Sequence, residues 1–118
     1  MTEARFDNRL CCVCRRPATG LGWAPKYVKT VDLVAWVCDD PECVAIARDS
    51  YGMKQLEFNR IDNMATSDAG AALEQFLDKI GKTDLRALTQ AEWDEALKTT
   101  IGGYRAALKG RLRDESPF

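Results

Sequence analysis

Two short cysteine clusters, CCVC at residues 11–14 and CDDPEC at residues 38–43, decide how the first half of this chain folds. Cys11 and Cys14 form a C-x-x-C pair, in which a tight turn lets two thiolates converge on one ion. Cys38 and Cys43 add a second pair, and two such pairs complete the tetrahedral ligand set that zinc prefers. The spacing therefore predicts one structural zinc ion held by these four cysteines.

The sequence around the second cluster predicts a strand followed by a helix. Residues 31–38 (VDLVAWVC) are rich in β-branched and aromatic residues and should form a strand, of which residues 33–38 pair with a short strand at residues 21–24. Asp40 suits a helix N-cap, and Pro41 suits the first helical position because its missing N–H costs nothing there. The helix should span about residues 41–51, with Cys43 in its first turn. A knuckle, a β-hairpin and a helix that carries the last ligand make up a treble-clef zinc finger.

Disulfides and plain burial are the alternatives for these cysteines. Residues 1–20 lack the pattern of a secretory signal, and no apolar run approaches the ~18 residues of a membrane span. In a reducing cytosol, paired cysteines at this spacing are more often metal ligands than disulfides. Cys12 is an alternative to Cys11 as a ligand, but the two-residue spacing favours Cys11, so Cys12 is expected to be a small buried residue.

The second half of the chain predicts two helices. Apolar residues recur at three- and four-residue steps from Ile61 to Ile80, and Gly81 ends the pattern, with an interruption at residues 63–68 left open. TQAE at residues 89–92 is a capping box that opens a second helix, and Trp93 lies on the apolar face of this helix. The poor helix formers at residues 99–103 indicate a kink or a close helix crossing. Together these segments predict an αα-hairpin whose apolar side chains, Phe76 and Trp93 among them, pack on one another or on the finger.

The expected fold class is therefore α+β, in two lobes that pack as one compact unit. The first lobe, residues 1–54, is the treble-clef-like zinc finger, and the second, residues 55–118, is the α-helical hairpin. A chain of 118 residues has room for one ordinary domain or for these two small lobes. The finger alone is too small to bury much core, so the metal should supply much of its folding free energy.

Composition argues against an enzyme. The chain has no histidine, which removes the ordinary general base, the imidazole metal ligand and any nucleophile–histidine pair. A zinc site with four cysteine ligands is closed to substrate, and the sequence contains no phosphate loop, dinucleotide fingerprint or serine elbow. The carboxylates at residues 39–42 and 92–95 are interpreted as helix caps and first-turn acids. We expect no catalytic residue and no small-molecule substrate.

Basic and aromatic residues near the finger, with one tyrosine of the last helix, are the candidates for contacting a partner. They are Arg15, Arg16, Trp23, Lys26, Tyr27, Lys29 and Tyr104. The basic members would suit nucleic acid, or they would offset the charge of −2 on a zinc ion with four thiolates. The cations of the last helix, from Arg105 to Arg113, have a simpler alternative, because cations near a helix C-terminus complement its dipole.

The run IGKTDL at residues 80–85, followed by LT at 88–89, EW at 92–93 and GY at 103–104, resembles a family of small uncharacterised proteins of phages and prophages. Members of that family look like a cysteine finger joined to a helical segment of this kind. The four predicted ligands, with Trp36 just before the second pair, fit the pattern, whereas Cys12 departs from it. The resemblance implies a viral or prophage context, and hence the cytoplasm of a bacterial host.

Two classes of function follow from these observations. The first is a protein-binding inhibitor or adaptor that acts on a host protein or protein complex, for example in a defence system such as CRISPR. The second is an accessory factor that binds nucleic acid through the finger. A net charge of −1 and a pI of about 5.5 favour the first, because nucleic-acid-binding domains are usually basic. No membrane partner is expected.

Overall fold

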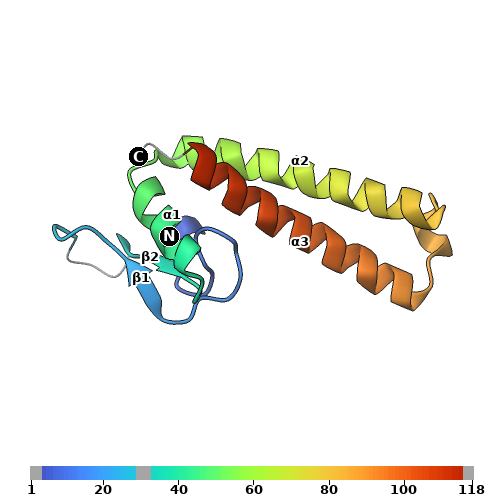
Figure 1. Cartoon of the computed structure of the whole chain (residues 1–118), viewed down its shortest axis with the longest axis horizontal. Coiled ribbons are helices and arrows are strands. Elements are labelled where there is room, and N and C mark those ends of the chain that lie inside the picture. The colour runs from blue at the N-terminus through green and yellow to red at the C-terminus, as the bar shows by residue number, and fades with distance from the viewer. Residues whose placement is uncertain (1–3, 29–32, 116–118) are drawn as a thin grey trace.

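The computed structural model describes residues 4–28 and 33–115 of the chain. Figure 1 shows a small lobe of strands and one helix at one end, from which two long helices extend side by side. The described part measures 54 × 28 × 25 Å. The fold is α+β, as the sequence predicts. The named elements are η1 (Ala4–Phe6), β1 (Leu21–Trp23), β2 (Ala35–Val37), α1 (Pro41–Ser50), α2 (Gln55–Ile80), η3 (Leu85–Ala87) and α3 (Gln90–Glu115).

The two strands form the predicted β-hairpin, although each is only three residues long. They pair antiparallel, with Leu21 opposite Val37 and Gly22 opposite Trp36. Ala35 and Val37 are buried while Trp36 between them is half-buried, so β2 turns one face to the core. A side chain at Gly22 would meet a methyl group of Val34 at 2.3 Å, so glycine is required for this close pairing. Residues 29–32, where the predicted strand begins, lie outside the described residues.

Helix α1 begins where the sequence predicts. The Asp40 side chain caps the helix by accepting a hydrogen bond from the backbone N–H of Glu42 at 2.9 Å, and Pro41 takes the first helical position. The buried face of the helix carries Cys43 and Ile46. The first turn of α1 is therefore fixed locally by its own cap, and this fixes the position of Cys43.

Helices α2 and α3 form the predicted hairpin, and both run without a break for 26 residues. Helix α2 is not interrupted at residues 63–68, where the sequence allowed a break. Ala65 and Ala69 are buried, and this packing outweighs the weak helix propensity of the segment. Gly81 ends α2 in the left-handed conformation with φ of 71°. The capping box opens α3 through two reciprocal bonds, from the Glu92 N–H to Thr89 Oγ1 at 3.1 Å and from the Thr89 N–H to Glu92 Oε1 at 2.9 Å.

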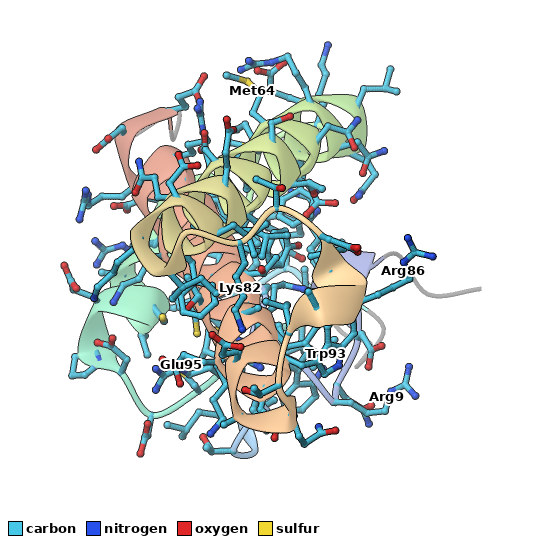
Figure 2. The ribbon with its side chains drawn as sticks, turned by 90° about the vertical axis from the view of Figure 1, so that its right-hand side faces the viewer. Arg9, Met64, Lys82, Arg86, Trp93 and Glu95 are labelled. Carbon is cyan, nitrogen blue, oxygen red and sulfur yellow. The ribbon has the colours of Figure 1, made fainter. Side chains whose placement is uncertain are left out.

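The poor helix formers of α3 mark a close crossing with α2. A Cβ atom at Gly103 would lie 2.9 Å from the Cβ of Ala72 and 3.6 Å from the Cα of Ala69. Small residues on both helices therefore let the two backbones approach each other. At the closed end of the hairpin, Lys82 after α2 pairs with Glu92 of α3 at 2.6 Å, and Figure 2 views the molecule from this end.

One continuous hydrophobic core joins the finger to the hairpin. From the finger it includes Val13, Val37 and Ile46, and from the hairpin Ile61 and Leu112. Residues 51–54 separate α1 from α2 at the predicted lobe boundary, but the division of the chain into lobes 1–54 and 55–118 stays a prediction. Among the residues that the structure describes, no helix combines the length and the apolar character needed to cross a bilayer.

Candidate metal centre

The first cysteine pair lies on a tight knuckle. Leu10 and Pro17 form an isolated antiparallel bridge, and inside it the Cys11 N–H donates to the Arg16 carbonyl at 2.7 Å. The Arg15 N–H donates to the Cys11 carbonyl at 3.1 Å. Arg15 has a φ of +63°, a left-handed conformation that usually favours glycine. This reversal turns the chain sharply after Cys14, so both thiols of the pair face the same point.

The knuckle is held against β2, which delivers the second pair. The Cys12 N–H donates to the Trp36 carbonyl at 2.8 Å, and the Thr19 N–H donates to the Val37 carbonyl at 3.2 Å. Cys38 follows β2 directly, and Cys43 lies in the first turn of α1. The second pair thus comes from a strand end and a helix start, as the sequence predicts.

The structure brings four cysteine sulfurs into one buried cluster. The Sγ atoms of Cys11, Cys14, Cys38 and Cys43 all lie within 4.8 Å of one another. The Cys14 and Cys38 sulfurs are 3.7 Å apart. Four sulfurs at about 2.3 Å from one zinc ion would be separated by about 3.8 Å, so the cluster fits a tetrahedral ion. All five cysteines are free thiols, so disulfide bonds do not hold the finger together.

The thiol pKa values show why this cluster needs a cation. Burial raises the pKa of Cys43, and negative charge on Cys11 and Cys14 raises it further. Burial also raises the pKa of Cys14. Burial opposes ionisation of Cys11 as well, but backbone N–H donors lower its pKa overall, among them the Val13 N–H at 3.4 Å from the sulfur. Without a cation, four thiolates cannot share this buried site, so metal binding must release protons.

Cys12 lies outside the cluster, as the spacing of the cysteines predicts. Its side chain is buried beside Phe6, Ala35 and Phe58, with which it lines a small gap in the packing. Burial raises the pKa of Cys12 to about 12, so it stays a neutral thiol. It is a core residue and not a metal ligand in this arrangement.

The carboxylates beside the second cysteine pair have a structural role. Lys109 of α3 places its Nζ 2.7 Å from Asp40 Oδ2 and 3.0 Å from Glu42 Oε2. The hydrogen bond from Lys109 holds the pKa of Asp40 below its usual value, and the Glu42 N–H adds to the effect. Lys109 therefore ties α3 to the start of α1, in addition to any interaction with its own helix dipole. The two partners are 69 positions apart in the sequence, so sequence reasoning could not predict this contact.

Arg111, a second cation of α3, also has a role beyond complementing the helix dipole. Arg111 Nε lies 2.7 Å from Asp68 Oδ2, and its Nη2 lies 3.3 Å from Oδ1, so the two groups form a bidentate pair across the hairpin. This pair holds the pKa of Asp68 below its usual value. Complementing the helix dipole is therefore not the whole role of the cations on α3.

Those candidate partner-binding residues that the structure describes do not form one surface. Arg16, Lys26 and Tyr27 are exposed, and Tyr27 is the most open of the three aromatic candidates at 77 %. Lys26 and Tyr27 lie after β1, on the loop that extends away from the hairpin in Figure 1, whereas Arg16 faces α3. Arg15 is half-buried, with Nη1 3.5 Å from the Cys11 carbonyl oxygen. Lys29 lies outside the described residues.

Trp23 and Tyr104, two of the aromatic candidates, are half-buried in contacts within the chain. Trp23 is half-buried and packs edge-to-face on Tyr51, with ring centroids 5.2 Å apart. Tyr104 is half-buried between the helices, where its hydroxyl donates to the Asp62 carboxylate of α2. Both side chains make contacts within the chain, since Trp23 packs on Tyr51 and Tyr104 faces helix α2.

A stripe of large apolar side chains on α3 is exposed instead. Trp93, Leu97 and Ile101 follow one another at four-residue steps and are exposed by 40 %, 45 % and 49 %. The expectation that Trp93 packs within the hairpin or on the finger is therefore wrong. Figure 2 shows Trp93 and Glu95 on opposite sides of α3. We call Trp93, Leu97 and Ile101 the apolar stripe.

A cleft of about 630 Å³ separates the metal centre from α3. On the finger side it is bounded by residues that include Cys14, Arg16 and Cys38. On the α3 side it is bounded by residues that include Lys98 and Ile101. Ile101 belongs both to the cleft and to the apolar stripe, so the two features form one continuous surface. Sequence reasoning found Arg16 but gave no reason to single out Lys98.

One of the three comparisons with known proteins finds a match, and it covers the hairpin. A sequence model for a family of unknown function (DUF6511) matches residues 56–118, which is more than half of the chain. The match contains nearly all of α2 together with η3 and α3, and the cysteine cluster lies outside it. Searches of curated proteins and of solved structures find no match. The family description names no phage or prophage, so that context still rests on the sequence resemblance alone. By its hairpin, the chain belongs to the DUF6511 family of unknown function.

Proposed function

We propose that this protein is a non-catalytic binding protein, stabilised by one structural zinc ion, whose role is to bind another protein. The observation that carries this function is the apolar stripe on α3. Its three side chains are spaced about 6 Å apart along a rigid helix. Large apolar groups presented in this way act as anchors for a partner, because their desolvation supplies much of the binding energy.

Zinc is the metal that best suits the donor set. The four sulfurs are soft thiolate ligands at near-tetrahedral separations, and the chain contains no histidine. When bound, zinc would neutralise the thiolates and link the knuckle, β2 and α1 at one point. Four protein ligands leave no coordination position for a substrate, which supports a structural role over a catalytic one.

The proposed partner is a protein of a bacterial host, in the host cytoplasm. The resemblance of the IGKTDL segment and its flanking motifs to phage and prophage proteins supports this placement. Small phage-encoded proteins without catalytic machinery often act by binding host macromolecules. An inhibitor of a host defence system, such as CRISPR, is the specific form of this proposal.

The test is capture of a partner by matched variants of the tagged full chain. Wild-type protein should retain a host protein from nuclease-treated lysate, and Trp93→Ser combined with Leu97→Ser and Ile101→Ser should lose at least about tenfold of the captured amount. Leu56→Ser is the matched control, because Leu56 lies on α2 and is 83 % exposed. It should capture the same protein as the wild type.

Two outcomes would contradict the proposal. Equal capture by the stripe variant and the wild type would show that the stripe is not the binding surface. Loss of the complex after nuclease treatment, together with a mobility shift of DNA or RNA that weakens steeply with salt, would favour a nucleic-acid-binding factor instead.

A further inference from the structure

Three cations bound the cleft between the metal centre and α3. They are Arg16 of the knuckle and Lys98 and Arg105 of α3. Within residues 4–28 and 33–115, their side chains make no hydrogen bond or ion pair. In contrast, Lys109, which also bounds the cleft, is already paired with Asp40. The donors of the three cations are therefore available to a ligand.

The charge of the metal centre does not account for these free donors. A zinc ion with four thiolates has a charge of −2, which nearby cations offset through space. However, Coulombic compensation leaves the N–H groups of a guanidinium without acceptors, and Arg16 and Arg105 each bring five such groups. Carboxylate oxygens match this geometry through bidentate hydrogen bonds, which are among the strongest that proteins form.

We propose that the cleft and the apolar stripe together bind an acidic amphipathic helix of the partner protein. This inference rests on the protein-binding function proposed above and names the chemistry of the partner. Lys98 and Arg105 are seven residues apart, which is about 10 Å along α3. A partner helix laid along α3 would present carboxylates at the same interval, two turns apart. Its apolar face would then cover Leu97 and Ile101.

The composition of the cleft favours a protein segment over a nucleic acid. Among the described residues that bound the cleft there is no aromatic side chain, so these residues offer bases no stacking platform. Cys14, Cys38, Asp39 and Asp40 also border the cleft, and the negative charge of these carboxylates would repel a continuous phosphate backbone. An acidic helix avoids this repulsion because it concentrates its carboxylates at a few positions.

Selection from a library of random peptides tests the inference. The zinc-loaded full chain is immobilised, and the bound peptides are sequenced. The expected binders are rich in Asp and Glu and carry Leu, Ile or Phe at helical spacing. Arg16→Ala, Lys98→Ala and Arg105→Ala should each weaken the best peptide by about tenfold. Arg113→Ala is the matched control on α3. Among the described residues, Arg113 pairs with the adjacent Asp114 alone, so this variant should leave binding unchanged.

Several results would overturn the inference. Recovery of no binder, of binders without acidic enrichment, or of binders that the three alanine variants retain would each do so. If the binders need the apolar stripe but not the cations, the inference fails while the protein-binding function stands. If a single-stranded oligodeoxythymidine binds in place of the peptides and needs the same cations, both proposals fail. Zinc content and far-ultraviolet circular dichroism confirm that each variant is folded.

Discussion

Cys43 is the ligand whose replacement should have the clearest effect. It is fully buried, and it links the first turn of α1 to the cluster. Cys43→Ser removes one of four thiolates, so we expect loss of the bound metal and unfolding of the finger, because structural zinc supplies about 10 kcal/mol or more of folding free energy in small fingers. Elemental analysis should find about one zinc per wild-type chain and almost none in the variant.

Cys12→Ala is the control for this prediction. Cys12 lies in the knuckle, between the ligands Cys11 and Cys14, but its side chain lies in the core and outside the cluster. The variant should keep its zinc and lose only the packing of one small side chain, about 1 kcal/mol. Zinc loss in Cys12→Ala, or a wild-type chain that folds fully without metal, would contradict the assignment.

Single residues also show what spacing alone can establish. The two cysteine pairs, the Asp40 cap and the capping box at residues 89–92 were all predictable, because each depends on neighbours a few positions away. The pairs between Lys109 and Asp40 and between Arg111 and Asp68 were not predictable. Each joins residues more than 40 positions apart, and their meeting depends on how the helices cross.

Within the hairpin, the crossing at Gly103 should be sensitive to a single methyl group. Gly103→Ala would force a Cβ to within 2.9 Å of the Cβ of Ala72, so the two helices must separate. Gly102→Ala is the matched control, because nothing lies within 4 Å of its Cβ position. Both variants gain about 1 kcal/mol of helix propensity. Gly103→Ala should therefore be less stable than Gly102→Ala by about 1–3 kcal/mol, the cost of overpacking.

Urea unfolding followed by circular dichroism measures this difference. The comparison cancels propensity and isolates crowding between α2 and α3. Equal stability of the two variants would show that the helices have room at the crossing, and the small residues there would then need another explanation.

The elements also show where periodicity stops being informative. The limits of α2 and α3 follow from Gly81 and the capping box, so they were predictable. The apolar positions of α3, however, cover more of the helix than α2 can bury. Ala96 and Leu108 are buried, while Leu97 and Ile101 remain open. A sequence pattern cannot tell which part of a wide apolar face will be covered within the chain. For this reason it predicts a packed Trp93, whereas the side chain is exposed.

At the scale of the whole molecule, removal of the metal should affect both halves of the chain. Phe58, Ile61 and Leu112 of the hairpin share one core with the four cysteines. Loss of about 10 kcal/mol of metal binding is comparable with the total stability of a small domain. A strong chelator should therefore abolish cooperative thermal unfolding and most of the helical circular dichroism signal, and added zinc should restore both.

The contrary result would be informative about the lobes. If the chelated chain keeps its helical signal and a cooperative transition, residues 55–118 fold on their own and the predicted boundary is a true domain boundary.

The cleft is also a property of the whole molecule. It is bounded by Lys98, Arg105 and Arg16 because the finger packs beside α3. The separate sequence segments therefore could not predict that these three cations share one cleft.

The shared core has a consequence for how the chain folds during synthesis. Leu108 and Leu112, near the C-terminal end of the described chain, are fully buried against residues of the finger. The finger is made first, yet its apolar interior stays open until these two leucines have left the ribosome. Early capture of zinc would hold the nascent knuckle, β2 and α1 together during this wait. Metal supply would then govern how much newly made protein escapes aggregation.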